Sequence, residues 1–453
     1  MMNPNITSTH QFYNQTMMGL SQFMADELKL VPHRSGIGQP SRAVYQIQQA
    51  KDTPRTISVQ LVINPRYLDT LRSHREALSM AAKLDGDQSI RITRGYAGRL
   101  TLEIPKPETL WFNIGIADLP QGQGLKTAVG LDQTSQPTLV NFGYDLTPHA
   151  LIAGTTGSGK TNLEQLLVHN LTQYNTPEDV QIILVDVEKR GKRWNAFNRL
   201  AHLAHPVVIE EEEAQQILTW AVAEVDKRRK QHRSSPRLFL FIDEMQQLVK
   251  LDGVIDPIVR IAQMGREYGV HFIGAVQDPT KDNLGHTDIQ RNIPLRLVGR
   301  VTNATAAYIA TAQKQSGADQ LVGAGDFLVL QPGQMIQRVA IALLQSRDIG
   351  KLPRLEQINR LDFAGLDDTD HVLDVTQKPG RPIDEYDWDK IGHMVGRMSE
   401  EGMINEHTAR RWFNVGLNKA NRFLDAAGGI LGGLQANGYE VVKTSPTPDQ
   451  TVV

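Results

Sequence analysis

The chain has 453 residues, of which 40% are hydrophobic, and its formal net charge is −2. This length and composition predict a globular protein of two to four domains with a buried core. The sequence contains no cysteine, which excludes a disulfide framework, a Cys-ligated zinc site and a thiol nucleophile, and the near-neutral charge argues against a protein that coats nucleic acid through bulk positive charge.

The start of the chain lacks the basic segment and apolar run that a secretory signal needs. The longest apolar stretches, such as Leu238–Ile242, are far shorter than the roughly 20 residues that span a bilayer. We therefore expect a cytoplasmic protein without a membrane anchor of its own.

Residues 1–30 are polar and rich in methionine without a clear period, and we expect an N-terminal arm there that is disordered or loosely helical. Residues 31–109 are predicted to form a small α+β domain. Alternating apolar residues indicate strands at 43–47, 57–63, 89–93 and 100–104. Leucines and alanines at helical spacing between 67 and 84 indicate a helix.

Residues 110–350 alternate short apolar segments with amphipathic ones, which is the order of an open parallel sheet covered by helices. The expected strands are 150–153, 182–185, 238–242, 271–276 and 295–298. Residues 351–385 contain an acid-rich stretch with prolines and a glycine, which indicates a linker. Helical patterns predict a compact C-terminal unit at 386–443, and residues 444–453 are predicted to be a disordered tail.

A phosphate-binding loop follows the strand expected at 150–153. The pattern G-x-x-x-x-G-K-[ST] is formed by Gly154, Thr155, Thr156, Gly157, Ser158, Gly159, Lys160 and Thr161. An apolar strand precedes the pattern and a helical run follows it, so successive backbone N–H groups are expected to surround the phosphates of ATP at a helix N-terminus. Lys160 is then expected to reach the β and γ phosphates and Thr161 to coordinate Mg²⁺. The alternative is a glycine-rich turn that binds no nucleotide.

Two carboxylates, Asp243 and Glu244, end the apolar run that begins at Leu238. In an ATPase with this loop, Asp243 is expected to hold Mg²⁺ through water and Glu244 to orient or deprotonate the attacking water. An acidic pair at the end of a strand also serves as a helix N-cap, which is the alternative for this pair.

Further residues are candidates for the same site. Gln277 ends the strand expected at 271–276, where a polar side chain can touch the γ-phosphate and sense hydrolysis; a plain loop residue is the alternative. Asp186 is expected to be structural or interfacial. The candidates for an arginine that reaches the nucleotide of a neighbouring subunit are Arg266, Arg296 and Arg300.

The ordered set of motifs resembles the motor portion of the FtsK/SpoIIIE family of DNA translocases from about Arg42 to the end of the chain. The matching segments are Pro148–Thr161, Met264–His271, Asn292–Arg296 and Leu321–Leu328. The resemblance implies a RecA-like P-loop ATPase domain with a parallel-type central sheet, preceded by the small domain. It also implies a homohexameric ring with double-stranded DNA in its channel. Arg266 lies where the family carries its candidate trans-acting arginine.

The C-terminal unit is similar to the winged-helix domain with which the family reads DNA orientation sequences. The resemblance places Asn418, Lys419 and Arg422 on the recognition helix. Arg410 and Arg411 add to a local basic face on an otherwise neutral chain, which favours DNA binding. The alternative is a solvated helix in a docking domain.

Two segments depart from the family's pattern. Asp278 stands where a basic residue is common, which bears on how hydrolysis is coupled to movement. The approach to the recognition helix also differs at Trp412 and Asn414, from which we expect a different preferred DNA sequence.

Together these features predict an ATP-hydrolysing, ring-forming translocase of double-stranded DNA. Two other functions stay open: a related ring ATPase that moves protein in secretion or conjugative coupling, and a DNA-binding module that uses ATP as a switch. The basic C-terminal helix argues against the first of these, since a motor that moves protein has no need of a DNA reader.

Overall fold

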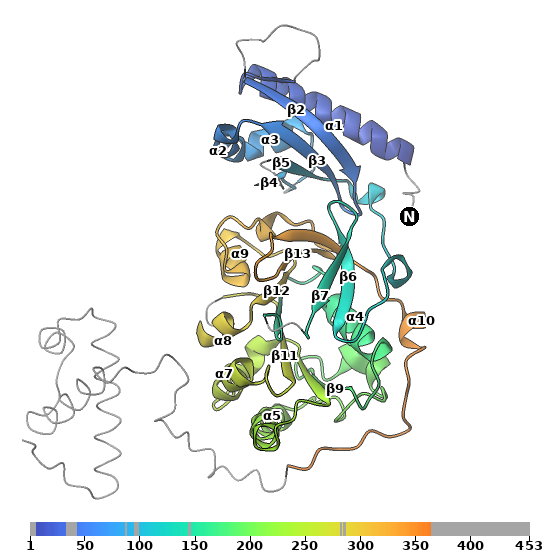
Figure 1. Ribbon diagram of the computed structural model, residues 1–453. Coiled ribbons are helices and arrows are strands. Elements are labelled where there is room, and N and C mark those ends of the chain that lie inside the picture. The colour runs from blue at the N-terminus through green and yellow to red at the C-terminus, as the bar shows by residue number, and fades with distance from the viewer. Residues whose placement is uncertain are drawn as a thin grey trace, which may run out of the picture. The chain divides into compact units, whose positions relative to one another are not determined.

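The structure, a computed structural model, describes residues 6–32, 43–86, 88–94, 99–143, 146–280, 283 and 287–363. The chain divides into two compact units, Met1–Leu366 and Asp367–Val453, and all of the described residues lie in the first. Their strands form one sheet of five strands and one of nine (Figure 1). The C-terminal unit expected at 386–443 and the tail at 444–453 lie outside the described residues.

The five-stranded sheet has the order β1-β2-β3-β5-β4, with β1 parallel to β2 and the other neighbours antiparallel. The strands are Leu30–Pro32 (β1), Ala43–Asp52 (β2), Thr56–Ile63 (β3), Arg91–Arg94 (β4) and Leu100–Pro105 (β5). Helices α2 (Leu68–Ser73) and α3 (Arg75–Ala81) lie between β3 and β4 in the sequence. The expected α+β arrangement is present, although the helix expected between 67 and 84 is divided at His74.

The N-terminal arm expected at 1–30 is instead largely a helix, α1 (Ile6–Asp26), which packs against α3 and β1. Thr16, Leu20 and Met24 lie on one face of α1 and are buried. A Cβ atom on Gly19 would come within 2.0 Å of the Ala81 carbonyl oxygen, so this glycine allows α1 and α3 to approach closely. The buried face includes threonines, which is why the apolar periodicity in the sequence was weak.

The nine-stranded sheet has the order β7-β6-β14-β13-β12-β8-β11-β10-β9. Its strands are β6 (Lys126–Asp132), β7 (Pro137–Asn141), β8 (Ala150–Ala153), β9 (Val180–Val185), β10 (Arg237–Ile242), β11 (Val270–Val276), β12 (Leu295–Val298), β13 (Asp326–Leu330) and β14 (Gln337–Ile341). The run from β12 to β9 is parallel and contains all five strands expected from the sequence. The other half, from β13 to β7, is antiparallel, so the sheet is mixed rather than wholly parallel.

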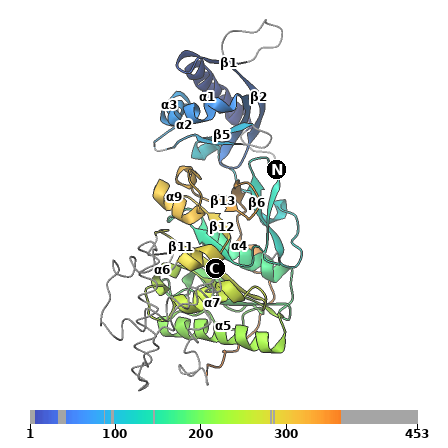
Figure 2. The same cartoon turned by 60° about the vertical axis from the view of Figure 1, so that its left-hand side comes forward.

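Helices cover both faces of the parallel half, which explains why its strands are continuously apolar. The helices of this part are α4 (Lys160–Gln173), α5 (Glu211–Gln231), α6 (Met245–Leu248), α7 (Ile255–Met264), α8 (Thr287–Asn292), α9 (Ala304–Thr311) and α10 (Ser346–Ile349). Leu240 and Ile242 of β10 pack into the core shared with α5 and α7, which lie side by side (Figure 2). Phe239 and Phe241 point to the opposite face, into the core beneath α4.

A buried ion-pair network joins the small sheet to the large one. Arg338 of β14 donates two hydrogen bonds to Asp326 of β13, at 2.9 and 2.7 Å, and one to Glu103 of β5 at 2.8 Å. Arg91 of β4 donates to both oxygens of Glu103 at 2.9 Å and to the Ser316 carbonyl. The small domain is therefore anchored to the antiparallel half of the large sheet. The domain limits at 31–109 and 110–350 stay predictions.

The segment after α10 pairs with residues 199–201, which precede the residues that line the outer side of β9, although the sequence predicted a linker from 351. Backbone hydrogen bonds join Ala201 N–H to the Pro353 carbonyl and Leu355 N–H to the Arg199 carbonyl. Arg199 also donates to the carbonyls of Leu355 and Glu356. We call residues 351–363 the exit segment.

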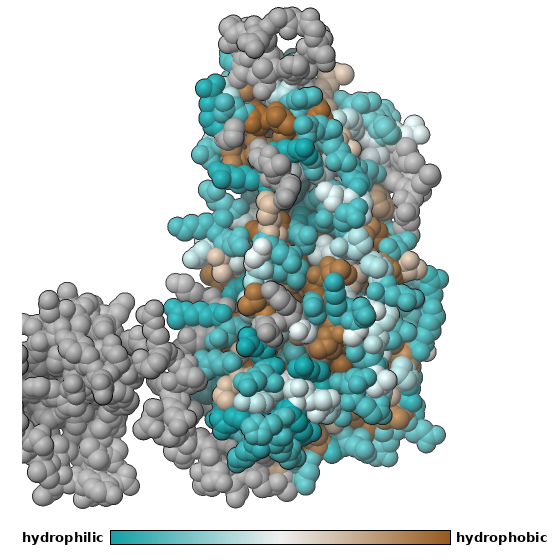
Figure 3. Space-filling model, viewed as in Figure 1, coloured by the Kyte–Doolittle hydropathy of each residue, from teal (hydrophilic) through white to brown (hydrophobic). Residues whose placement is uncertain are grey.

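The face of the molecule seen in Figure 3 is mostly hydrophilic, with apolar side chains in small separate patches, as is usual for a globular surface. Within the described part of the chain, no helix is both long and apolar enough to cross a membrane.

Candidate nucleotide-binding site

The predicted phosphate-binding loop connects β8 to the N-terminus of α4. Gly154, Gly157 and Gly159 have φ values of 154, 80 and 102°. A Cβ atom on Gly159 would lie 2.9 Å from the backbone nitrogen of Gly325, and one on Gly154 would lie 2.7 Å from Ser158 Oγ. The loop therefore needs glycine at these positions, and its N–H groups lie at the start of a 14-residue helix.

Backbone contacts hold the loop in place from several sides. Thr155 donates to the Arg300 carbonyl through its N–H at 2.7 Å and its hydroxyl at 3.1 Å. The N–H groups of Ala324 and Gly325 donate to the carbonyls of Gly157 and Ser158, at 3.0 and 2.8 Å. These hydrogen bonds fix the shape of the loop.

Lys160 and Ser158 show how the loop could receive a phosphate. Lys160 is buried, and its Nζ donates to the Gly154 carbonyl at 2.8 Å. The buried Ser158 hydroxyl oxygen has no hydrogen-bond partner. A buried ammonium and an unsatisfied hydroxyl are donors that an incoming phosphate would engage.

Asp243 and Glu244 follow β10, which is separated from β8 by β11 alone. Both side chains are buried, at 4% and 2% exposure. Glu244 has a φ of 50°, a left-handed conformation that costs a non-glycine residue roughly 1–2 kcal/mol. Burial raises the pKa of the Asp243 carboxyl to about 6, although the hydrogen bond and charge of Arg193 act to lower it.

The residues present fit a magnesium ion bound with nucleotide. Asp243 Oδ1 is buried and has no hydrogen-bond partner within the part of the chain that the structure describes. Thr161 lies in the first turn of α4 beside Lys160. A carboxylate, a hydroxyl and phosphate oxygens are the hard oxygen ligands that Mg²⁺ prefers.

Arg193 was not expected from the sequence, yet it contacts both acids. Its Nη1 donates to Asp243 Oδ2 and its Nη2 donates to Glu244 Oε1 at 3.0 Å. Gln246 donates to the other oxygen of Glu244. Both oxygens of the expected base therefore accept hydrogen bonds from protein side chains.

The loop between β9 and α5 places Arg193. Gly191, with a φ of 75°, precedes the short 3₁₀ helix Lys192–Phe197. Asp186 accepts a hydrogen bond from the Lys189 N–H at 3.0 Å and a long one, 3.4 Å, from the Arg193 N–H. Gln165 of α4 donates to the Arg193 carbonyl at 2.5 Å. The structural alternative proposed for Asp186 thus fits its contacts.

Glu164 is a second residue that the sequence did not single out. It lies on α4 and is 1% exposed, and neither of its carboxylate oxygens has a hydrogen-bond partner among the described residues. Burial, and next the negative charge of Asp243, raise the pKa of Glu164 well above its usual range. The positive charges of Lys160 and Arg193 act in the opposite direction and lower this pKa.

Gln277 lies at the carboxyl end of β11, and its Nε2 donates to the hydroxyl of Thr156 in the phosphate-binding loop. The structure thus brings the sensor candidate to the loop.

The three arginine candidates differ in position. Arg266 is exposed and lies before Val270, the first residue of β11, whereas the phosphate-binding loop lies beside the last residue of that strand. Seven residues of strand separate these ends by roughly 20 Å, so Arg266 is remote from its own loop. Arg296 is buried and donates to the carbonyls of Ile309 and Ala310, while Arg300 contributes the carbonyl that holds Thr155.

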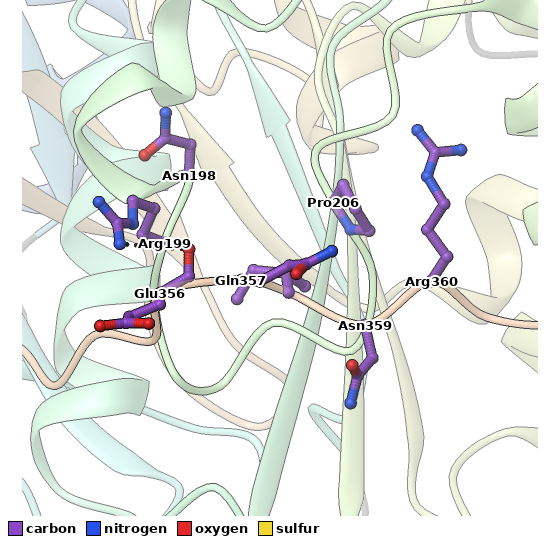
Figure 4. Close-up of a pocket in the computed structure, with 8 residues that line it drawn as sticks. Asn198, Arg199, Pro206, Glu356, Gln357, Asn359 and Arg360 are labelled. Carbon is purple, nitrogen blue, oxygen red and sulfur yellow. Dashed lines mark hydrogen bonds between the residues drawn. The ribbon is translucent and has the colours of Figure 1, made fainter.

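The DNA-contact candidates, Arg410, Arg411, Asn418, Lys419 and Arg422, lie outside the described residues. A shallow hollow elsewhere is lined by Asn198, Arg199, Pro206 and residues 356–360 of the exit segment (Figure 4). None of the candidate catalytic residues lines it.

Comparison with known proteins gives consistent matches. Residues 115–239 match the model of the FtsK/SpoIIIE family. The DNA translocase FtsK of Leptospira interrogans is 25% identical over 393 residues, which cover 79% of this chain and 40% of that protein. The DNA translocase FtsK of Chlamydia muridarum is 31% identical over 303 residues, which cover 58% and 37%. The chain thus spans about two fifths of the length of these relatives.

Among solved structures, the conjugation coupling protein TcpA of pCW3 aligns with a TM-score of 0.47 at 18% identity, over 68% of this chain and 93% of that one. The family and relative matches confirm the resemblance to the FtsK/SpoIIIE family that the motifs indicated.

Proposed function

We propose that the protein hydrolyses ATP to move double-stranded DNA through a homohexameric ring, and that it works in the cytoplasm. The observation that carries this proposal is the position of Lys160 after β8 and of Asp243 and Glu244 after β10, at the carboxyl ends of parallel strands that only β11 separates. The names of the FtsK relatives support DNA as the substrate.

In this proposal the phosphate-binding loop and Lys160 bind the phosphates of ATP. Thr161 and Asp243 would hold Mg²⁺, which neutralises charge that develops on the phosphates. Glu244 orients the attacking water and accepts its proton, for which one of its oxygens must leave Arg193 or Gln246. Gln277, bonded to Thr156, registers the change in the loop after hydrolysis.

Replacing Glu244 with Gln tests the assignment of the base. Because the amide cannot accept the proton, ATP turnover should fall by roughly 10²- to 10⁴-fold while nucleotide binding is kept. Steady-state hydrolysis and equilibrium binding of a fluorescent ATP analogue measure the two effects. The control is Arg190→Gln, which removes an exposed ion pair with Glu210 in the loop that precedes Arg193. Full DNA-stimulated hydrolysis by Glu244→Gln would contradict the assignment.

Arg266 is proposed to complete the nucleotide site of the next subunit. Subunits carrying Arg266→Ala and subunits carrying Lys160→Ala should each be inactive alone. Mixed rings should regain part of the activity, because a Lys160→Ala subunit still offers Arg266 to a neighbour that binds ATP. Absence of any recovery in mixtures shown to co-assemble would rule out action in trans.

Movement along DNA is tested by displacement of a third strand bound to a duplex. Wild-type protein should strip the strand only with hydrolysable ATP, whereas a motor for protein or an ATP-dependent switch would leave it in place. Electron microscopy of the protein with a non-hydrolysable ATP analogue and short duplex checks the ring, which should show six subunits around the DNA.

The proposed DNA contacts are Arg410, Arg411, Asn418, Lys419 and Arg422. Alanine at the four cationic positions should weaken duplex binding and lower the dependence of affinity on salt by about one unit of slope for each phosphate that is no longer neutralised. Alanine at Asn418 should instead reduce discrimination between duplex sequences. Binding isotherms at several salt concentrations separate the two effects.

A further inference from the structure

The peptide of Ala324 lies between the phosphate-binding loop and the small domain. The N–H of Ala324 donates to the Gly157 carbonyl. The N–H of Gly325, which belongs to the same peptide group as the Ala324 carbonyl, donates to the Ser158 carbonyl. Three successive residues, Gly323, Ala324 and Gly325, have φ values of 85, 50 and 88°. A left-handed alanine persists only where its surroundings enforce the conformation. The turn is therefore a built contact with the loop.

Arg55 holds the other side of the same peptide. This residue lies in the turn between β2 and β3 of the small domain and is 9% exposed. Its Nε and Nη2 both donate to the Ala324 carbonyl, at 3.2 and 3.0 Å. The forked guanidinium thus binds one carbonyl with two donors, a geometry that lysine cannot reproduce.

The remaining contacts of Arg55 fix its head group to the start of the large domain. It donates to the carbonyl of Phe112 and to Oδ1 of Asn113, at 2.5 and 2.7 Å, and lies over the ring of Trp111 at 5.0 Å from the centroid. These acceptors are neutral, unlike the carboxylate that neutralises Arg91. A buried cation held by neutral groups costs desolvation, so its position points to a role beyond attaching two domains.

We propose that Arg55 is a positioning residue of the nucleotide site, which acts through the Ala324 peptide on the phosphate-binding loop and transmits nucleotide binding to the small domain. This inference rests on the proposed nucleotide site. When bound phosphates shift Gly157 and Ser158, the N–H groups of Ala324 and Gly325 should move with them, because losing a buried hydrogen bond costs about 1–3 kcal/mol. Arg55 follows the carbonyl of the same peptide.

Hydrogen exchange on the full-length protein tests the transmission. In the wild type, adenylyl imidodiphosphate with Mg²⁺ should slow exchange in the phosphate-binding loop, at 323–325 and in the β2–β3 turn around 53–56. In Arg55→Met the loop should still be protected, whereas the change at 53–56 should disappear. Arg72→Met is the matched control, because Arg72 also reaches from the small domain to the large one, at Gln315, without touching this turn.

Affinity gives a second measurement. Arg55→Met should weaken binding of the analogue by roughly 3- to 10-fold, the equivalent of about one hydrogen bond, and Arg72→Met should leave it unchanged. Arg55→Lys keeps the charge and loses the two-donor geometry, so it should behave like Arg55→Met and serves if that variant does not fold.

The outcomes separate the nucleotide site from the role of Arg55. If the loop shows no protection in the wild type, the proposed nucleotide site is wrong. If the loop is protected and the change at 53–56 persists in Arg55→Met or in Arg55→Lys, or is absent from the wild type, the role of Arg55 is wrong and the nucleotide site stands.

Discussion

Two of the clusters of buried charge in the described part of the chain differ in how far their members are paired: one lies where the two sheets meet and the other at the carboxyl end of β10. In the first, Arg338 and Arg91 satisfy both oxygens of Glu103, and Arg338 also satisfies both oxygens of Asp326. In the second, both oxygens of Glu164 and one of Asp243 have no partner. Buried carboxylates thus have all their oxygens hydrogen-bonded in the first cluster and only some of them in the second.

The difference distinguishes buried charged groups that stabilise the fold from buried groups that are available to bind a ligand. A closed network satisfies buried groups and fixes the orientation of two elements. Unpaired buried oxygens and the left-handed backbone of Glu244 instead destabilise the folded protein. Such groups concentrate where a nucleotide and its metal ion would complete them.

The largest expected effect is at the closed network. Arg338→Met leaves Glu103 and Asp326 buried with fewer partners, so the free energy of unfolding should fall by about 3–5 kcal/mol. Urea unfolding measures it, with the exposed Arg347→Met as control. A loss below about 1 kcal/mol would mean that the network does not stabilise the fold.

Arg193→Gln tests the ion pairs in the second cluster, at the carboxyl end of β10. The substitution removes the charged partner of Asp243 and Glu244, so unfolding without nucleotide should become easier by about 1–3 kcal/mol. Saturating Mg²⁺ and ATP analogue should restore part of this stability. The exposed Arg190→Gln should change stability by less than about 0.5 kcal/mol.

Glu164→Met tests the residue of the second cluster whose carboxylate oxygens are unpaired. Its expected effect on the free energy of unfolding is opposite in sign to that of Arg193→Gln. Because the carboxyl is buried without a partner, its replacement by an apolar side chain of similar size should raise the free energy of unfolding by about 1–2 kcal/mol. Glu224 is the control: it is also a buried helical glutamate, but Arg228 and Arg233 pair with it. Glu224→Met should therefore destabilise, and equal effects at both positions would end the distinction.

Acid sharpens the comparison at the closed network. Burial would raise the pKa of Glu103, but Arg91 and Arg338 outweigh it and leave the pKa below its usual 4.5. The stability from Glu103 is therefore complete above pH 4.5 and is lost as the pH falls through the folded-state value, by at most about 1.4 kcal/mol per pH unit. The stability difference between wild type and Glu103→Gln should be constant above pH 5 and shrink below pH 4.5.

Local patterns accounted for the parts of the site that a short segment encodes. Strand, glycine-rich turn and helix N-terminus are consecutive in the phosphate-binding loop, and Asp243 and Glu244 end one apolar strand. The parallel strands were predicted for the same reason, since their continuous apolar runs follow from burial on both faces. Residues that meet within one segment can be inferred from that segment.

Residues that depend on remote contacts could not be found in this way. Four cations lie between Lys189 and Arg193, and only the turn at Gly191 decides that the last one meets Asp243. The antiparallel half of the large sheet depends on pairing β14 with β6, which lie about 200 residues apart. Helix α1 was expected only as one of two alternatives, a loose helix or a disordered arm, because its buried face includes threonine. Glu164 was missed because helical glutamates are usually exposed.

The exit segment has a consequence for self-association. A strand at the edge of a sheet exposes unpaired N–H and C=O groups that can recruit another chain. Backbone bonds from Ile182 and Asp186 to His202 and Val208 occupy the outer side of β9, and the exit segment pairs in turn with residues 199–201. The outer side of β9 is therefore already occupied, so another chain cannot add to the sheet as a strand directly beside β9.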